Sequence, residues 1–199
     1  MARTLLGALG LAASAALLAA CSGGGEVAGT PNTTSAPPAQ SSSATGPSEA
    51  PRVSTPLPTD ALLNRPCDAL SAAQTTEIGM VDPQSSQTAT GPQCRWRSAS
   101  DRNNTITIQA VTANKGGLDD IYFTKPQSAY FEPVQIGGQP AVYTSNLDAR
   151  PSGTCVLWVG ATDQLAVSVG AQISFGQNKT NPCPVAQRAA TAMVENLRG

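Results

Sequence analysis

Five cysteines behind an export signal are the feature that most limits how this chain can fold. Cys21 ends an apolar N-terminal run, and the other four are Cys67, Cys94, Cys155 and Cys183. Unpaired thiols oxidise outside the cytoplasm, so an even set of four predicts two disulfides, for which three connectivities exist. A metal site is the alternative. The chain has no C-x-x-C pair and no histidine, so zinc-type spacing is absent, and we expect no metal and no cofactor.

The first 20 residues have the layout of a secretory signal peptide. Arg3 provides a positive start, residues 5–20 are Leu, Ala and Gly with one Ser, and Leu18-Ala19-Ala20-Cys21 ends the run. The small-small-Cys ending resembles the bacterial lipoprotein signal, in which the cysteine sulfur is lipidated, the peptide is cut before it and the new N-terminus is acylated. We expect Cys21 to carry several acyl chains, palmitate among them, because stable anchoring requires more than one chain.

Two alternatives to lipidation stay open from the sequence. Ordinary cleavage after a small-residue site would leave Cys21 as a spare thiol, and an uncleaved membrane helix would retain the apolar run. The run is shorter than the roughly 20 residues that span a hydrocarbon core, and no other apolar stretch of that length occurs. The predicted location is the extracytoplasmic face of the cell membrane, with the lipid on Cys21 as the attachment.

A change of composition after Cys21 predicts the domain organisation. Residues 21–62 are mainly Gly, Ser, Thr, Pro, Ala and Gln, with too few apolar residues to offset the entropy of ordering. The remainder has the commonest size of a domain. We therefore predict a signal peptide over residues 1–20, a lipidated N-terminus and disordered tether over 21–62, and one globular domain over 63–199.

Hydrophobic patterning over residues 63–199 predicts an α+β fold, an antiparallel β-sheet of about five or six strands with helices packed on it. A capping box of Ser71 and Gln74 predicts a short helix that stops at Gly79. Pro133 predicts an edge strand, and Asn181 is the expected cap of the last helix. The predicted strands are 93–98, 105–111, 130–136, 140–144, 154–160 and 165–169, and the further helices are 117–123 and 182–197.

The places of the four cysteines in these elements suggest a sequence-ordered pairing. Cys67 precedes the first helix and Cys94 begins a strand, while Cys155 begins the most apolar strand and Cys183 lies in the first turn of the last helix. We predict the disulfides Cys67–Cys94 and Cys155–Cys183. Together they would fasten one helix to each face of the sheet.

Six short motifs in this order resemble a known family, the actinobacterial exported lipoproteins that carry a domain of unknown function (the family numbered 3558 among such domains). The resemblance implies a small α+β domain with an antiparallel sheet of the PsbP or Mog1 type, and it implies no activity. One departure is that the family often begins its helix with Thr-Pro-Ala-Glu, where this chain has Ser71-Ala72-Ala73-Gln74. The motifs are Cys21, Cys67-Asp68-Ala69-Leu70-Ser71, Cys94-Arg95-Trp96, Ile136-Gly137-Gly138-Gln139-Pro140-Ala141, Cys155-Val156-Leu157 and Pro182-Cys183-Pro184-Val185-Ala186.

Few residues remain that could carry chemistry. With no histidine, every Ser-His, Cys-His or metal-histidine mechanism is excluded. A serine-lysine pair with Lys115, Lys125 or Lys179 is one remaining option, and the carboxylates of Asp119 and Asp120 are the other. Those two carboxylates point about 100° apart on a helix, so spacing alone does not place them in one site. We expect no enzymatic activity and no catalytic residue.

Charge and aromatic residues leave a binding role. The net charge is −1, and loss of Arg3 with the signal peptide makes it −2, so we expect no nucleic-acid partner. Trp96 and Trp158 either line a ligand site or pack in the core beside the disulfides. We expect a noncatalytic domain that binds an envelope protein or serves as an accessory domain. The alternative is a small apolar molecule or lipid, bound in a pocket between sheet and helix near Trp158.

Overall fold

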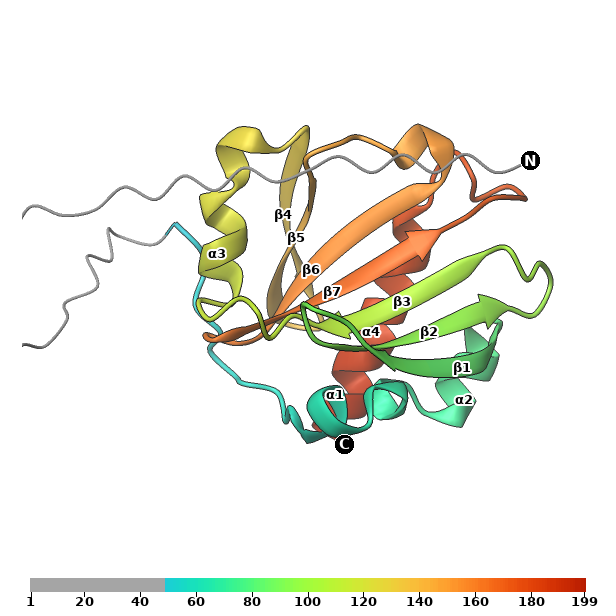
Figure 1. Ribbon diagram of the computed structural model, residues 1–199, viewed down its shortest axis with the longest axis horizontal. Coiled ribbons are helices and arrows are strands. Elements are labelled where there is room, and N and C mark those ends of the chain that lie inside the picture. Colours follow the sequence, from blue (N-terminus) through green and yellow to red (C-terminus); the bar gives the residue numbers. More distant parts are fainter. Residues whose placement is uncertain (1–48) are drawn as a thin grey trace, which may run out of the picture. The chain divides into compact units, whose positions relative to one another are not determined.

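Seven antiparallel strands form one sheet in the computed structural model, which describes residues 49–199 (Figure 1). The spatial order is β1-β2-β3-β7-β6-β5-β4. The strands are β1 (Met80–Gln87), β2 (Pro92–Ser98), β3 (Thr105–Ala110), β4 (Tyr130–Ile136), β5 (Gln139–Ser145), β6 (Thr154–Thr162) and β7 (Leu165–Gln172). The predicted signal peptide and Cys21 lie outside the described residues.

Four α-helices and three short 3₁₀ turns accompany the sheet. They are α1 (Asp60–Asn64), η1 (Pro66–Ala69), α2 (Ala72–Glu77), α3 (Leu118–Phe123), η2 (Lys125–Gln127), η3 (Arg150–Ser152) and α4 (Cys183–Arg198). The capping box of Ser71 and Gln74 is formed as predicted. The cap expected at Asn181 is wrong, because α4 begins at Cys183 and Pro182 occupies the N-cap position. None of the helices within residues 49–199 has the length and apolar character needed to cross a bilayer.

One face of the sheet is covered over its central strands by α4 and the small helices near the N-terminus. Strand alternation directs Leu157 and Val159 of β6 to this face, where both are completely buried. The apolar stripe of α4 lies against them, including Ala189 and Met193. Figure 1 shows α4 passing behind the sheet. This face is the main hydrophobic core.

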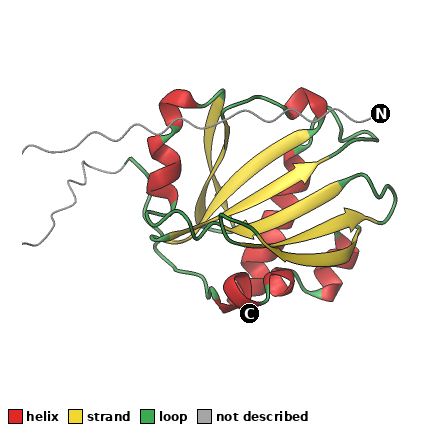
Figure 2. Cartoon of the chain, viewed as in Figure 1, coloured by secondary structure: helices red, strands yellow, loops and turns green. Residues whose placement is uncertain are grey.

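The opposite face is covered only in part. Leu118 and Ile121 of α3 pack on Val142 and Ala166, and Ala50 joins this smaller cluster. Elsewhere on this face, over β2, β3 and the part of β7 after Ala166, no helix within the described residues covers the strands (Figure 2). The two faces therefore have different roles, one closed by α4 and one partly open.

Both predicted disulfides are present, Cys67–Cys94 and Cys155–Cys183. The prediction that they serve opposite faces is wrong. Cys94 and Cys155 are both completely buried in the main core, beneath the same layer of helices. Alternation along the strands explains this. Cys94 shares its face with Trp96 and Cys155 shares its face with Leu157, and both Trp96 and Leu157 point into the main core.

The ordered domain begins earlier than the predicted boundary at residue 63. Residues 49–59, here called the strap, run along the end of the sheet. The Leu57 amide donates to the Ala161 carbonyl at 2.8 Å, and the Val53 amide donates to Asp163 Oδ1 at 2.9 Å. Leu57 is only 3% exposed. Prolines separate the apolar residues of the strap, so they give no helical or strand period, and composition alone assigned this segment to the tether.

The sheet has seven strands, where the sequence patterns predicted about five or six. The additional strand is β1, an edge strand whose residues after Val81 are exposed. Its pairing with β2 shifts between Val81 and Gln84, where Asp82 has φ 54° and Pro83 follows. Such a bulge suits an edge strand, and a strand that is polar on both sides lacks the period-2 signal. Pro133 lies in the other edge strand, β4, as predicted.

The Gly-Gly turn between β4 and β5 fits closely against α4. Gly137 and Gly138 have φ of 55° and 80°, a conformation that suits glycine. A Cβ on Gly137 would lie 2.9 Å from Val194 Cγ1, so a side chain there would press on α4. The next residue, Gln139, donates from Nε2 to the Thr55 carbonyl at 2.8 Å. This motif therefore joins the hairpin, α4 and the strap.

We expect the two disulfides to contribute almost equally to stability. Their cysteines are 27 and 28 residues apart, and the chain-entropy model assigns about 3.5 kcal/mol to a loop of this length. Cys67→Ala with Cys94→Ala, and Cys155→Ala with Cys183→Ala, should each lower the free energy of unfolding in urea by about this amount. A loss below about 1 kcal/mol for either pair would contradict the expectation.

Leu57→Ala tests the strap as part of the folded domain. Removing this buried side chain should lower the free energy of unfolding by about 2–5 kcal/mol. Leu63→Ala is the matched control, since Leu63 is 38% exposed and should lose no more than about 1 kcal/mol. Equal losses in urea unfolding would show that the strap does not contribute to the core.

Candidate functional site

A hollow of about 440 Å³ lies between α3, η2 and the strands β5 and β6. This volume is within the range of small-ligand sites. The hollow is open to solvent rather than enclosed, and it lies on the partly covered face of the sheet. We call it the Trp158 hollow. It is lined by Asn114, Ile121, Thr124, Gln127, Ser128, Thr144, Ser145, Asn146, Val156 and Trp158.

Strand alternation directs Trp158 into this hollow. Its neighbours Leu157 and Val159 point into the main core, so Trp158 and Val156 point to the opposite face. Trp158 pairs with Val142 of β5 on one side and Ser168 of β7 on the other. Paired strands on both sides hold the indole on a rigid part of the sheet.

The wall opposite the strands comes from α3. Gly117 precedes this helix with φ 56°, and a Cβ there would lie 2.8 Å from the Asp163 carbonyl oxygen. The close approach that glycine permits brings α3 against the β6–β7 turn. Leu118 then packs in the small cluster, while Ile121 both packs there and lines the hollow.

The polar groups of the hollow fall into two sets. The groups of the first set form hydrogen bonds within the protein. Thr144 Oγ1 donates to the Tyr130 carbonyl at 2.9 Å, and Thr124 Oγ1 donates to the Ile121 carbonyl at 2.8 Å. The second set comprises the side-chain amides of Asn114, Gln127 and Asn146. Within residues 49–199 these amides form no hydrogen bond to the protein. Three groups that both donate and accept are thus available to a ligand.

All the side chains that line the hollow are uncharged. Two lysines are next in sequence to lining residues, Lys125 after Thr124 and Lys115 after Asn114, and neither lines the hollow. Lys125 contacts Glu49 at 3.5 Å and lies 5.6 Å from the Phe131 ring centre. The arrangement can therefore bind through an indole, amides and hydroxyls, but its lining contains no acid, base or cation.

Of the two tryptophans considered as ligand residues, the structure places only Trp158 at a hollow. Trp96 is 1% exposed and packs in the main core with Cys94 and Ile106. It faces α4 and the small helices, on the opposite side of the sheet from Trp158. Arg95 and Arg97 lie on the other face of β2 from Trp96, because side chains alternate along a strand.

Among the residues considered for catalysis, Asp119, Asp120 and Lys125 each have another partner within the protein. Asp119 Oδ2 lies 3.9 Å from Arg52, and Asp120 Oδ2 accepts a hydrogen bond from the Gly116 amide at 2.8 Å. In the part of the chain that the structure describes, no hydrogen bond joins a lysine to a serine. Across the same residues, no group of three or more Cys, Asp or Glu is placed to hold a metal.

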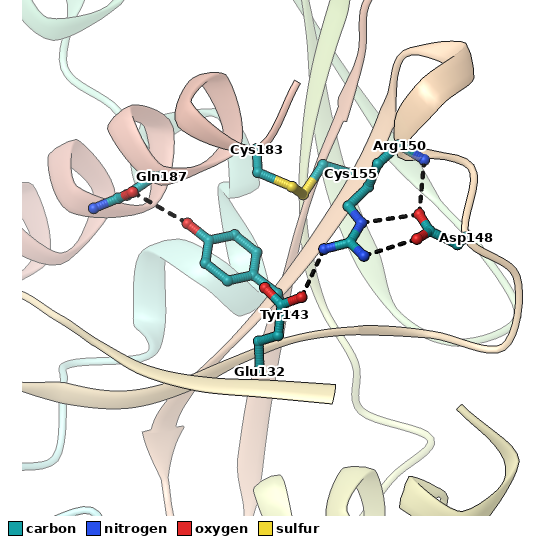
Figure 3. The surroundings of a disulfide bond; sticks show 7 residues. All are labelled: Glu132, Tyr143, Asp148, Arg150, Cys155, Cys183 and Gln187. Carbon is teal, nitrogen blue, oxygen red and sulfur yellow. Dashed lines mark hydrogen bonds and ion pairs between the residues drawn. A yellow bond between two sulfur atoms is a disulfide. The ribbon is translucent and has the colours of Figure 1, made fainter. Parts of the chain in front are cut away.

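A charged cluster beside the Cys155–Cys183 disulfide was not anticipated from the sequence (Figure 3). Arg150 donates to Asp148 Oδ2 at 2.7 Å and to Glu132 Oε1 at 2.8 Å, and it lies over the Tyr130 ring at 4.0 Å. Hydrogen bonding from Arg150 lowers the pKa of Asp148. These paired charges fasten the loop before β6 to the edge strand β4, so we assign the cluster a structural role.

Tyr143 should make stability fall at alkaline pH. Its hydroxyl donates to Gln187 Oε1 on α4 at 3.2 Å, and burial, with Glu132 nearby, raises its pKa. A raised pKa gives a contribution that is complete below the unfolded value of about 10 and is lost as pH rises through the folded value. Tyr143→Phe removes this contribution. The free energy of unfolding in urea should fall between about pH 8 and about pH 11, and it should fall less for Tyr143→Phe than for the parent protein. Equal losses would contradict the assignment.

Comparison with known proteins yields a family whose description assigns no function. A family described as "Protein of unknown function (DUF3558)" matches residues 16–196. No curated protein and no solved structure matches the chain. The expected likeness to the PsbP or Mog1 type therefore stays a prediction.

Proposed function

Because this chain belongs to the DUF3558 family, whose description assigns no activity, we propose its function from the site itself. It is a noncatalytic binding domain of the cell envelope. The lipid on Cys21 holds it at the extracytoplasmic face of the membrane, and the Trp158 hollow takes up its ligand. The two disulfides, which are typical of extracytoplasmic proteins, support this location.

The observation that carries the proposal is the pairing of an indole with three unused amides. Trp158 provides a large apolar surface on a rigid strand, and Asn114, Gln127 and Asn146 provide donors and acceptors around it. Ligand sites generally combine such an apolar wall with a few convergent polar groups. The uncharged lining supports binding without catalysis, because general acid–base chemistry requires a titratable group within reach of the substrate.

Two ligand classes expected from the sequence can be weighed at this site. A lipid chain gains most from an enclosed apolar cavity, and this hollow is open and bordered by amides and hydroxyls. A protein partner is the second candidate. Its support is two exposed apolar side chains next in sequence to lining residues, Phe123 beside Thr124 (81% exposed) and Leu147 beside Asn146 (68% exposed), and neither side chain lines the hollow itself.

Photo-crosslinking in the native host tests the binding site. A benzophenone amino acid at Gln127, on the rim of the hollow, should form an adduct in living cells, because benzophenone inserts into C–H bonds of any nearby ligand. Adding Trp158→Ala should reduce this adduct at least tenfold, which corresponds to a loss of about 1.4 kcal/mol.

Gln177 is the matched control position, since it is an exposed glutamine in the loop after β7 and does not line the Trp158 hollow. A probe there should give no adduct that depends on Trp158. An adduct from Gln127 that survives Trp158→Ala, or the same adduct from both positions, would refute the proposed site.

A further inference from the structure

We propose that the Trp158 hollow binds an uncharged glycan chain. This inference rests on the proposed function, since it names the ligand class of that same site. Four observations support it: the lining is uncharged, an indole and three amides lie in the same hollow, one side of the hollow is open, and the neighbouring strands are paired on both edges.

The lining excludes ligands that need a counter-charge. All ten lining side chains are neutral, so a phosphate or carboxylate would lose hydration without gaining a cation. Two lysines are next in sequence to lining residues, and neither belongs to the lining. Lys125 is in contact with Glu49 and Phe131, and Lys115 follows Asn114 in the loop before α3. A polar but uncharged ligand therefore loses the least hydration free energy when it enters this hollow.

The remaining polar groups match vicinal hydroxyls. Each of the amides of Asn114, Gln127 and Asn146 both donates and accepts, and a hydroxyl group does the same. A sugar ring has an apolar face of C–H bonds and an edge of hydroxyls. The indole of Trp158 offers an apolar surface for such a face, and the surrounding amides offer partners for the edge.

The open side of the hollow favours a chain over a single sugar. Trp158 stands in register with Ser168 on β7, and Ser168 with Gln109 on β3. Neighbouring strands lie about 4.8 Å apart, so this row extends roughly 10 Å from the indole over the uncovered face. A Cβ on the adjacent Gly170 would meet no atom within 4 Å, which shows that the sheet surface beside Val156 is clear.

The strands beside the hollow do not suit an extended peptide. Addition of a peptide strand requires an unpaired strand edge, but β6 is paired with β5 on one side and β7 on the other. Grooves for proline-rich segments are lined by aromatic residues, and Trp158 is the only aromatic side chain that lines this hollow.

Calorimetric titration of the full chain tests the assignment. The protein is extracted from its own membrane into a zwitterionic detergent without sugar groups. It is then titrated with neutral tetrasaccharides of glucose, mannose, galactose or arabinose, with tetragalacturonate as the charged counterpart, and with a proline-rich decapeptide. We expect saturable binding of at least one neutral tetrasaccharide, and weaker or no binding of tetragalacturonate.

Matched variants locate the binding. Trp158→Ala should weaken it at least tenfold, and Gln127→Ala should weaken it about fivefold through one lost hydrogen bond. Gln177→Ala should leave it unchanged. Phe175→Ala, which removes an exposed aromatic side chain from a different loop, should also leave it unchanged.

The outcomes separate this inference from the proposed function. If no neutral tetrasaccharide binds, or if tetragalacturonate or the peptide binds more tightly in a manner that depends on Trp158, the glycan assignment is overturned. A Trp158-dependent adduct from Gln127 in cells would then leave the proposed binding site standing with a ligand of another class. If no neutral tetrasaccharide binds and no Trp158-dependent adduct forms in cells, both the glycan ligand and the proposed binding site are overturned.

Discussion

The packing of α4 against one face of the sheet is the contact on which the rest of the domain depends. It buries the inward-facing residues of β6 and β7 and is fastened covalently by Cys155–Cys183. With that face closed, alternation leaves every second residue of the same strands on the other face. Trp158 is exposed to a hollow because Leu157 and Val159 are buried under α4.

The strap and the small helices before β1 complete the same core. The strap bonds to β6 through Ala161 and to the following turn through Asp163, and Gln139 holds it at Thr55. Cys67–Cys94 joins η1 to β2 on this face as well. Both disulfides therefore reinforce one layer, and the partly open face has no covalent fastening among residues 49–199.

This asymmetry gives a physical reason for the position of the candidate site. Among residues 49–199, α3 is the one α-helix on the second face, and it covers Val142 and Ala166 but not β2 and β3. Side chains at its margin, such as Asn114 and Gln127, face both protein and solvent. A site at the margin of a helix on a rigid sheet can keep its amides unpaired at little cost, because water satisfies them until a ligand replaces it.

Much of the fold was predictable from local patterns. Six of the seven strands and the helices α2, α3 and α4 were predicted, as was the pairing of the cysteines. Each of these has a local signal, such as the capping box of Ser71 and Gln74 or the alternation around Trp96. The strand β1 and the strap lack one, since prolines and polar residues interrupt any period, and their order comes from contacts with distant parts of the chain.

The candidate site divides in the same way. The sequence by itself determined the disulfide framework and the absence of histidine chemistry, since both follow from which residues the chain contains and where the cysteines stand in it. Only the tertiary structure decided that both disulfides lie on one face, that Trp96 is enclosed while Trp158 is not, and that Asn114, Gln127 and Asn146 surround one indole. Those three amides come from three separate loops and turns, and no local pattern records which loops meet when a sheet folds.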